Sequence, residues 1–253
     1  MSPMFTNSPI RAILLDIEGT ITPISFVHDV LFPYARAHMN NYLGANFDSP
    51  ATTADLSLLR EEHALDMQQG KQPPPLVAAS GADALDSFVS YVFWLMDRDR
   101  KSAGLKSLQG KIWEDGYANL SLVAPLFPDV VPAIEKARQA GLQIAIFSSG
   151  SILAQRLLIA HTNAGDVSQL IDRYFDTTTG PKTAIPSYRQ IASTTGLDPS
   201  EILFISDVVA ELDAAVAMGM STLLCVRPGN QPQPPGRHQI IYSFAELWSV
   251  PSP

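Results

Sequence analysis

The sequence has a single cysteine, Cys225, among its 253 residues. One cysteine cannot form an internal disulfide, and such a composition is typical of a protein that resides in a reducing compartment. Cys225 lies in the apolar run at residues 222–226, where a buried structural thiol is expected rather than a reactive nucleophile. An internal disulfide is therefore excluded, and chemistry that depends on the cysteine is disfavoured.

Long apolar runs are also absent. No uninterrupted stretch approaches the roughly 20 residues that a membrane-spanning helix requires. Residues 1–8 lack the charged start and the apolar core of a secretory signal. We therefore expect no membrane association and a cytoplasmic location, and the sequence leaves open whether the protein also enters the nucleus.

Basic residues are in the minority. The chain has 17 Lys and Arg against 25 Asp and Glu, which gives a formal net charge of -8. Nucleic-acid-binding proteins normally present a basic face, so this balance argues against a nucleic acid as partner. It does not exclude a small anionic substrate, for which one local cluster of cations is sufficient.

Short apolar runs alternate with helical patterns over the second half of the chain. This alternation predicts an α/β fold, in which a parallel sheet has helices on both faces. The expected strands are residues 10–15, 142–147, 202–205, 222–226 and 239–242, and the expected helices are residues 130–140, 152–160, 188–193 and 208–218.

A long, mostly helical segment separates the first two predicted strands. A sheet crossover needs only about a dozen residues, so we expect residues 22–125 to form a helical domain inserted into a core of residues 1–21 and 126–253. A proline run at residues 73–75 is expected to form a loop. The helices predicted in the insert are residues 26–42, 54–69, 82–96 and 105–117.

Two carboxylates follow the first apolar run. Asp16 and Glu18 lie two residues apart in the segment DIEGT at residues 16–20, and such a pair is costly to hold close unless a cation joins them. With Mg²⁺ present, Asp16 can attack phosphorus, and Glu18 can protonate the leaving oxygen and then take a proton from water. Gly19 allows the chain to turn sharply. Taken alone, the segment is equally compatible with a simple turn after a strand.

Three more polar segments follow predicted strands or lie near them. Ser148 and Ser149 can bind an anion at the start of a helix, or one serine there caps the helix. Lys182 can neutralise a carboxylate and a phosphate together, or it lies on a surface loop. Asp207 can bind Mg²⁺ directly and Glu211 through water, or Asp207 is a helix cap. Because ligands bind beyond the carboxyl ends of parallel strands, the four segments together predict a phosphoryl-transfer site.

At these four segments the chain resembles the haloacid dehalogenase superfamily, whose pattern is an acidic first motif, a Ser or Thr second motif, a lysine third motif and an acidic fourth motif. More narrowly, it is similar to the enolase-phosphatases of methionine salvage. Ile21 and Ala103 depart from that family's usual residues, but neither change removes a catalytic group. The closer similarity rests on the segments LDIEGT (15–20), SSGS with AQ (148–151, 154–155), FDT with GPK (175–177, 180–182), WLMD (94–97) and LQGKIW with GY (108–113, 116–117).

The resemblance implies a Rossmann-like α/β core with an all-helical cap. It also implies enolisation and then dephosphorylation of 2,3-diketo-5-methylthiopentyl 1-phosphate, through an aspartyl-phosphate, to the acireductone 1,2-dihydroxy-3-keto-5-methylthiopentene. Carried over to this chain, the family's metal ligands fall on Asp16, Glu18 and Asp207, which would hold one Mg²⁺. The substrate would be bound by Ser148, Ser149 and Lys182.

Several points stay open at this level. Glu18 and Glu211 are both candidates for the enolisation base. A phosphatase of the same superfamily that acts on another small phosphate ester is the alternative function, and a non-enzymatic relative is disfavoured by the intact acidic and lysine residues. No amphipathic seam suggests an oligomer, so we expect a monomer that binds a small phosphorylated diketone.

Overall fold

The computed structural model describes residues 10–77, 81–234 and 236–248. Residues 1–8, where no secretory signal is expected, lie outside these ranges. Contacts between Cα atoms divide the chain into an α/β unit, Met1–His28 with Val123–Pro253, and a helical unit, Asp29–Leu122. The contact boundaries fall at His28 and Leu122, whereas the domain prediction placed them at residues 21 and 125. That the two units are separate domains stays a prediction.

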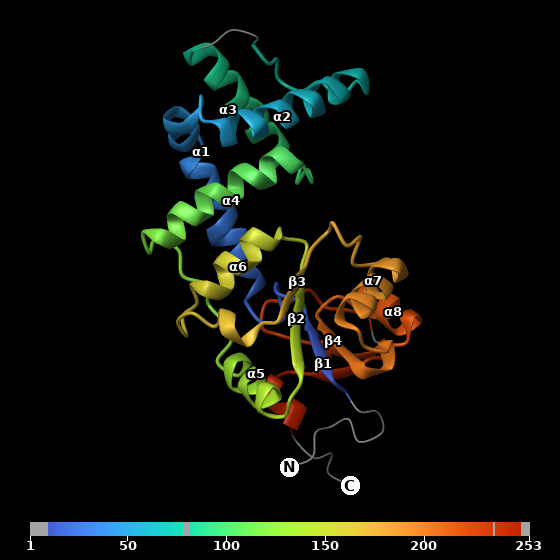
Figure 1. The fold of residues 1–253 in the computed structure, drawn as a ribbon. Helices are drawn as coiled ribbons and strands as arrows, with labels where there is room; N and C mark the ends of the chain where they lie inside the picture. Colours follow the sequence, from blue (N-terminus) through green and yellow to red (C-terminus); the bar gives the residue numbers. More distant parts are fainter. Residues whose placement is uncertain (1–9, 78–80, 235, 249–253) are drawn as a thin grey trace. The chain divides into compact units, whose positions relative to one another are not determined.

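Among the described residues of the α/β unit, six parallel strands form one sheet in the order β3-β2-β1-β4-β5-β6, which confirms the predicted α/β fold (Figure 1). The short edge strand β3 was not predicted, because only one of its three residues is buried and it forms no apolar run. The strands are β1 (Ala12–Leu15), β2 (Gln143–Phe147), β3 (Arg173–Phe175), β4 (Ile202–Ser206), β5 (Ser221–Cys225) and β6 (Gln239–Ile241).

The chain reverses its direction of travel across the sheet beside β1. It moves from β1 to β2 and β3 on one side, and β4, β5 and β6 follow on the other side. Leu15, the last residue of β1, pairs with Ile146 of β2 and Ile205 of β4, and the backbone N–H of Asp16 donates to the carbonyl of Ile205 at 3.0 Å. The ends of these three strands therefore meet where a parallel sheet forms its ligand crevice.

Helices cover both faces of the sheet (Figure 1). Leu14, Phe147 and Phe204 share one cluster with Tyr188 of α7 and Leu212 of α8, and all five are buried. Helix α5 contacts β2, and α5 and α6 lie on the side of the sheet opposite α7 and α8 (Figure 1). These helices are α5 (Val130–Gln139), α6 (Ile152–Ala160), α7 (Ile185–Thr195) and α8 (Val209–Met218).

The described residues of the helical unit form four α-helices, and the expected proline loop at residues 73–75 is confirmed. The helix predicted from residue 26 is divided: a π-helical segment, Phe26–Leu31, precedes α1, which begins just before Pro33. Proline has no backbone N–H and so cannot continue the hydrogen-bond ladder of a preceding turn. The helices are α1 (Phe32–Asn46), α2 (Pro50–Gln68), α3 (Ala82–Met96) and α4 (Ala103–Ala118).

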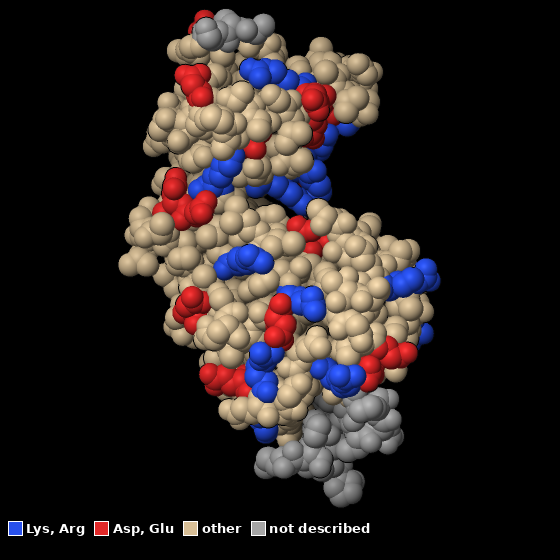
Figure 2. Space-filling model, in the orientation of Figure 1, with Lys and Arg blue, Asp and Glu red and all other residues tan. Residues whose placement is uncertain are grey.

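Several charged side chains of the helical unit form ion pairs within it. The buried carboxylate of Asp66 accepts hydrogen bonds from Tyr91, Lys71 and Arg100, at 2.9, 2.9 and 3.0 Å. Over the α/β unit, the face drawn in Figure 2 shows Lys and Arg interspersed with Asp and Glu rather than gathered in one broad basic patch. Within the described part of the chain, no helix combines the length and the apolarity that crossing a membrane requires.

Candidate active site

The 16–20 turn begins where β1 ends. Asp16 is buried, with 3% of its surface exposed. Gly19 N donates to Thr22 O at 2.8 Å and Thr22 N donates to Ile17 O at 3.1 Å, so the chain turns back within a few residues. Gly19 has φ +72°, a left-handed conformation that favours glycine, and a Cβ there would collide with the carboxylate of Asp207. Glycine at position 19 therefore lets Asp207 approach the turn.

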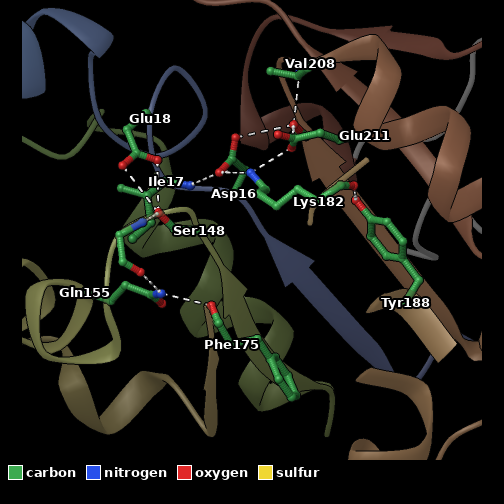
Figure 3. Close-up of polar contacts among 12 residues, drawn as sticks. Asp16, Ile17, Glu18, Ser148, Gln155, Phe175, Lys182, Tyr188, Val208 and Glu211 are labelled. Carbon is green, nitrogen blue, oxygen red and sulfur yellow. Dashed lines mark hydrogen bonds and ion pairs between the residues drawn. The ribbon is translucent and has the colours of Figure 1, made fainter. Parts of the chain in front are cut away.

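Lys182 joins two carboxylates at the centre of the site (Figure 3). Its Nζ lies 2.5 Å from Asp16 Oδ1 and 2.7 Å from Glu211 Oε2. Burial by itself lowers the pKa of Lys182, but the charges of Asp16 and Glu211 outweigh burial and raise that pKa above its ordinary value. The lysine is therefore charged, and it is not the surface-loop residue that was the simpler interpretation of its segment.

The backbone around Lys182 is held by Tyr188, whose hydroxyl donates to Lys182 O at 2.6 Å (Figure 3). Tyr188 belongs to α7, and its side chain is fully buried in the core. Gly180, two residues before the lysine, has φ +130°, and a Cβ there would collide with Ser187. The Gly-Pro turn and the core tyrosine together aim the lysine at the end of β1.

Glu18 points to a different partner. Its two carboxylate oxygens accept from the hydroxyl of Ser148 at 3.3 and 3.1 Å (Figure 3). Burial, followed by the nearby charge of Asp16, raises the pKa of Glu18. A carboxyl whose pKa is raised can hold a proton nearer to neutral pH, which suits a general acid.

The two predicted serines differ in their surroundings. Ser148 is fully buried at the end of β2, and its Oγ also accepts from Gly150 N at 3.1 Å. Ser149 is exposed. The cap of α6 is neither of them but Ser151, whose Oγ accepts from Ala154 N at 3.2 Å. Ser148 and Ser149 therefore precede the helix, and neither of them caps it.

Gln155 is part of the family resemblance, but the sequence predicted no role for it. In the structure it holds the serine loop, residues 148–151, in place. Its Nε2 donates to Gly150 O at 2.8 Å and to Phe175 O at 2.9 Å, and only 1% of its surface is exposed. Ser148 N also donates to Phe175 O, at 3.2 Å. The serine loop and the end of β3 are thereby tied together. The sequence signal that could have revealed this role of Gln155 was a polar residue on the buried side of a predicted helix.

Asp207 and Glu211 complete an acidic surround. Burial first, and then the charges of Asp16 and Glu211, raise the pKa of Asp207 to about 7. Burial and the charge of Asp16 raise the pKa of Glu211 to about 7. Ser206, which was not predicted, places its Oγ 3.0 Å from Glu211 Oε2 and 3.3 Å from Asp16 Oδ2, so its single O–H can donate to either carboxylate. The site therefore holds more negative charge than Lys182 alone compensates, and an added cation would relieve the excess.

Comparison with known proteins agrees with this geometry. A family model described as haloacid dehalogenase-like hydrolase matches residues 10–219. The enolase-phosphatase E1 of Synechococcus elongatus is 50% identical over 238 residues, covering 94% of this chain and 98% of that protein. This chain belongs to the enolase-phosphatase E1 family of haloacid dehalogenase-like hydrolases. As a member of this family it is an enzyme of the phosphatase class that acts on a small phosphorylated substrate.

Two further relatives bear on this family assignment. A probable bifunctional methylthioribulose-1-phosphate dehydratase/enolase-phosphatase E1 of Populus trichocarpa is 43% identical over 94% of this chain, which corresponds to 47% of that longer protein. The crystal structure of the UTR4 protein of Saccharomyces cerevisiae superposes with a TM-score of 0.75 at 33% identity, and the match covers 92% of this chain and 98% of the yeast chain. The enolase-phosphatase match thus includes both units of the structure.

A divalent metal cofactor suits this hydrolase family, and the residues present are compatible with one. Within the described residues, no three His, Cys, Asp or Glu side chains form a metal-binding group. Mg²⁺, however, commonly takes only one or two carboxylates and completes its shell with water and substrate phosphate. Asp16 and Asp207 could supply two such carboxylates, and burial first, then the charges of Asp16 and Glu211, raise the pKa of Asp207. The donor set therefore fits a hard divalent cation.

Proposed function

We propose that this enolase-phosphatase converts 2,3-diketo-5-methylthiopentyl 1-phosphate to the acireductone 1,2-dihydroxy-3-keto-5-methylthiopentene, by enolisation and then dephosphorylation, in methionine salvage. The observation that carries the proposal is the separation of the site into two parts: a buried Asp16–Lys182–Glu211 ion cluster and a Glu18 side chain held apart by Ser148. The sequence identity of 50% to an enolase-phosphatase E1, over 94% of this chain, supports the choice of substrate.

Asp16 is the nucleophile in this proposal. A carboxylate oxygen of Asp16 forms a bond to phosphorus while the bond from phosphorus to the substrate oxygen breaks, and the aspartyl-phosphate results. Hydrogen bonds from Lys182 Nζ and from Ile17 N, at 2.5 and 2.8 Å, both reach Asp16 Oδ1 and fix the plane of the carboxylate. Lys182 also offsets the negative charge that gathers as the phosphate approaches.

Glu18 serves as the acid and then the base. In its protonated form it gives a proton to the departing oxygen, and as a carboxylate it takes a proton from the water that attacks the phosphorus of the aspartyl-phosphate. Asp16 and inorganic phosphate are then regenerated. The raised pKa of Glu18 supports the first of these roles, and its position on the same short turn as Asp16 supports both.

The phosphate is bound by the serine loop and by Lys182. Ser148 and Ser149 supply hydroxyls ahead of α6, and backbone N–H groups at a helix N-terminus favour an anion. Ser148 already contacts Glu18, so the residue that binds phosphate also orients the acid. Gln155 keeps this loop at its distance from β3.

One Mg²⁺ per chain would be held by Asp16, Glu18 and Asp207. The carboxylate of Glu18 is hydrogen-bonded to Ser148, so we assign metal binding at this residue to its backbone carbonyl oxygen. The hydrogen bonds of the turn join Ile17, Gly19 and Thr22 and do not use that oxygen. When bound, the ion supplies charge neutralisation at the phosphate and polarises the substrate carbonyl. A monomeric, cytoplasmic enzyme is part of the same proposal.

The enolisation base was left open between two glutamates, and the contacts favour Glu18. Glu211 is bonded to Lys182 at 2.7 Å and to Ser206 at 3.0 Å, and both contacts are buried. The Glu18 carboxylate accepts a hydrogen bond from Ser148 and, within the described residues, forms no ion pair such as the one between Glu211 and Lys182. We therefore assign to Glu18 the removal of the proton next to the carbonyl, and to Glu211 the orientation of Lys182.

A two-signal assay tests the reaction. The enzyme is given the diketo phosphate, and inorganic phosphate is measured alongside the ultraviolet absorbance of the enol. We expect the enol signal to rise before or together with phosphate, because enolisation precedes dephosphorylation. Phosphate release without any enol signal, from a substrate able to enolise, would contradict the proposal and favour a phosphatase for another ester.

Removal of the metal gives a separate expectation. Treatment with EDTA should stop phosphate release, and addition of Mg²⁺ in excess should restore it, since the acidic site cannot accept a phosphate dianion without the added positive charge. The measurement is the phosphate release rate before chelation, after it and after re-addition. Full activity in EDTA-treated enzyme would remove the metal from the mechanism.

A further inference from the structure

The loop that follows β5 reaches across to the 16–20 turn. Arg227 Nε donates to Thr20 O at 3.2 Å, and Asn230 Nδ2 donates to Gly19 O at 2.9 Å. The loop and the turn are separated by about two hundred residues along the chain, and no role was predicted for either side chain. Two successive carbonyls of the turn that carries Asp16 and Glu18 are thus bound by one loop.

Arg227 is rigidly placed. Only 6% of its surface is exposed, and its guanidinium lies over the rings of Phe127 and Phe244, at 4.4 and 5.1 Å from their centroids. Its NH1 donates to Asp129 Oδ2 at 2.8 Å and to Tyr242 O at 3.1 Å. The planar guanidinium therefore connects the start of α5, the end of β6 and the 16–20 turn at once, which a lysine could not do.

Asp129 is the fixed anchor of this arginine. Burial by itself raises its pKa, but hydrogen bonds from Arg227, Phe244 N and Ser243 outweigh burial and lower that pKa below its ordinary value. The carboxylate accepts from Phe244 N at 2.5 Å and from Ser243 Oγ at 2.9 Å. Arg227 is consequently held by a charged partner that is itself bound to the backbone.

Asn230 faces the acidic side of the turn. Its Oδ1 is buried and has no hydrogen-bond partner among the described residues. A Cβ built on Gly19 would collide with Asp207 Oδ2 and closely approach Asn230 Oδ1, so both oxygens lie close to Gly19. The amide thus binds the carbonyl of Gly19 with its nitrogen and presents its oxygen near Asp207.

We propose that Arg227 and Asn230 are positioning residues for the reaction, which fix the 16–20 turn so that Asp16, the Glu18 carbonyl and Asp207 keep the geometry required for metal binding and attack on phosphorus. The inference rests on the proposed function for the roles of these groups. Neither residue needs to contact the substrate. Small displacements of a nucleophile or a metal ligand cost rate rather than substrate affinity, so the effect belongs mainly to kcat.

Asn230→Ala and Arg227→Lys test the proposal. We expect each to lower kcat about 10- to 100-fold, as loss of residues that orient metal ligands commonly does, with KM changed by less than about threefold. Calorimetric titration with Mg²⁺ alone should show an affinity weakened by about tenfold. This second readout needs no turnover and would not move if the two side chains only stabilised the fold.

Matched controls separate positioning from stability. Gln231→Ala removes the adjacent, exposed amide of the same loop and should leave kcat and metal affinity at wild-type values. Met220→Ala removes buried volume at the opposite end of β5 and should lower the melting temperature without lowering kcat per folded molecule. Values of kcat and metal affinity within about twofold of wild type in both Asn230→Ala and Arg227→Lys would overturn the proposal.

A generic aryl phosphate keeps the test independent of the natural substrate. If wild-type enzyme hydrolyses p-nitrophenyl phosphate but not the diketo phosphate, the proposed function fails while the positioning role is still measured on the aryl ester and by metal titration. If wild-type enzyme turns over both and the variants lose neither activity nor metal affinity, the positioning proposal alone fails.

Discussion

Asp16→Asn should lower phosphate release by about a thousandfold or more, even at saturating Mg²⁺, because an amide cannot form the aspartyl-phosphate. The substitution keeps the size of the side chain, and the fold should remain intact. Phosphate release under saturating substrate is the measurement, with circular dichroism as the test of folding. This is the largest effect on turnover that we expect from a single substitution.

Asp213→Asn is the matched control for this change. Asp213 lies on α8 with its side chain 51% exposed, and its Oδ1 contacts Arg237 and His238, neither of which belongs to the site. The same loss of a carboxylate there should leave turnover unchanged, because asparagine keeps Oδ1 as an acceptor and no group of the site contacts it. Turnover of Asp16→Asn at the wild-type level would exclude Asp16 as the nucleophile.

Lys182→Met should be the most destabilising substitution in the site. Asp16 and Glu211 would remain buried without their cation, and breaking a buried ion pair on one side costs about 3–5 kcal/mol. For a chain of this size, that loss corresponds to a melting temperature lower by about 10 °C. Phosphate release should also fall by about a hundredfold or more, since Lys182 neutralises the nucleophile and the phosphate together.

The stability loss should depend on pH in a defined direction. Burial and Asp16 already raise the pKa of Glu211 to about 7, above its ordinary 4.5, and Lys182, together with the hydrogen bond from Ser206, lowers it. A carboxyl with a raised pKa destabilises the fold when it is ionised. Without Lys182 the pKa of Glu211 would rise further, so the loss in Lys182→Met should grow as the pH rises above 7 and should be smaller at pH 7 and below.

Thermal unfolding of both proteins in EDTA, at several pH values, measures this dependence. Arg11→Met is the control, because Arg11 pairs with Glu201 while its own side chain is 60% exposed. Removing that surface pair should change the free energy of unfolding by at most about 1 kcal/mol. A Lys182→Met protein as stable as Arg11→Met at pH 8 would show that the buried carboxylates do not depend on the lysine.

Much of the α/β fold could be predicted from local patterns. The buried runs that became β1, β2, β4 and β5 are short, apolar and bounded, and such runs are typical of the central strands of a covered sheet. The edge strand β3 escaped notice because an edge position needs little burial. The division of the first inserted helix at Pro33 also escaped, although proline carried the signal.

The site was only partly predictable. Asp16, Glu18, Lys182 and Asp207 were named because they are chemically distinctive and follow strands that end at one sheet edge. Ser206, Gln155, Arg227 and Asn230 were assigned no role in the chemistry, because their importance lies in hydrogen bonds to backbone carbonyls and carboxylates far away in the sequence. No spacing within the chain reports such partners.

By itself, the sequence determined the kinds of chemistry available to this protein: the strand-end carboxylates, the lysine, the serines and the glycine that permits a sharp turn. Only the tertiary structure decided how those groups are shared out. In the folded protein Lys182 forms ion pairs with Asp16 and Glu211, and Glu18 is hydrogen-bonded to Ser148. The physical reason is that charge and hydrogen-bond energies depend on distances of a few ångströms, which packing fixes between residues as far as 166 positions apart.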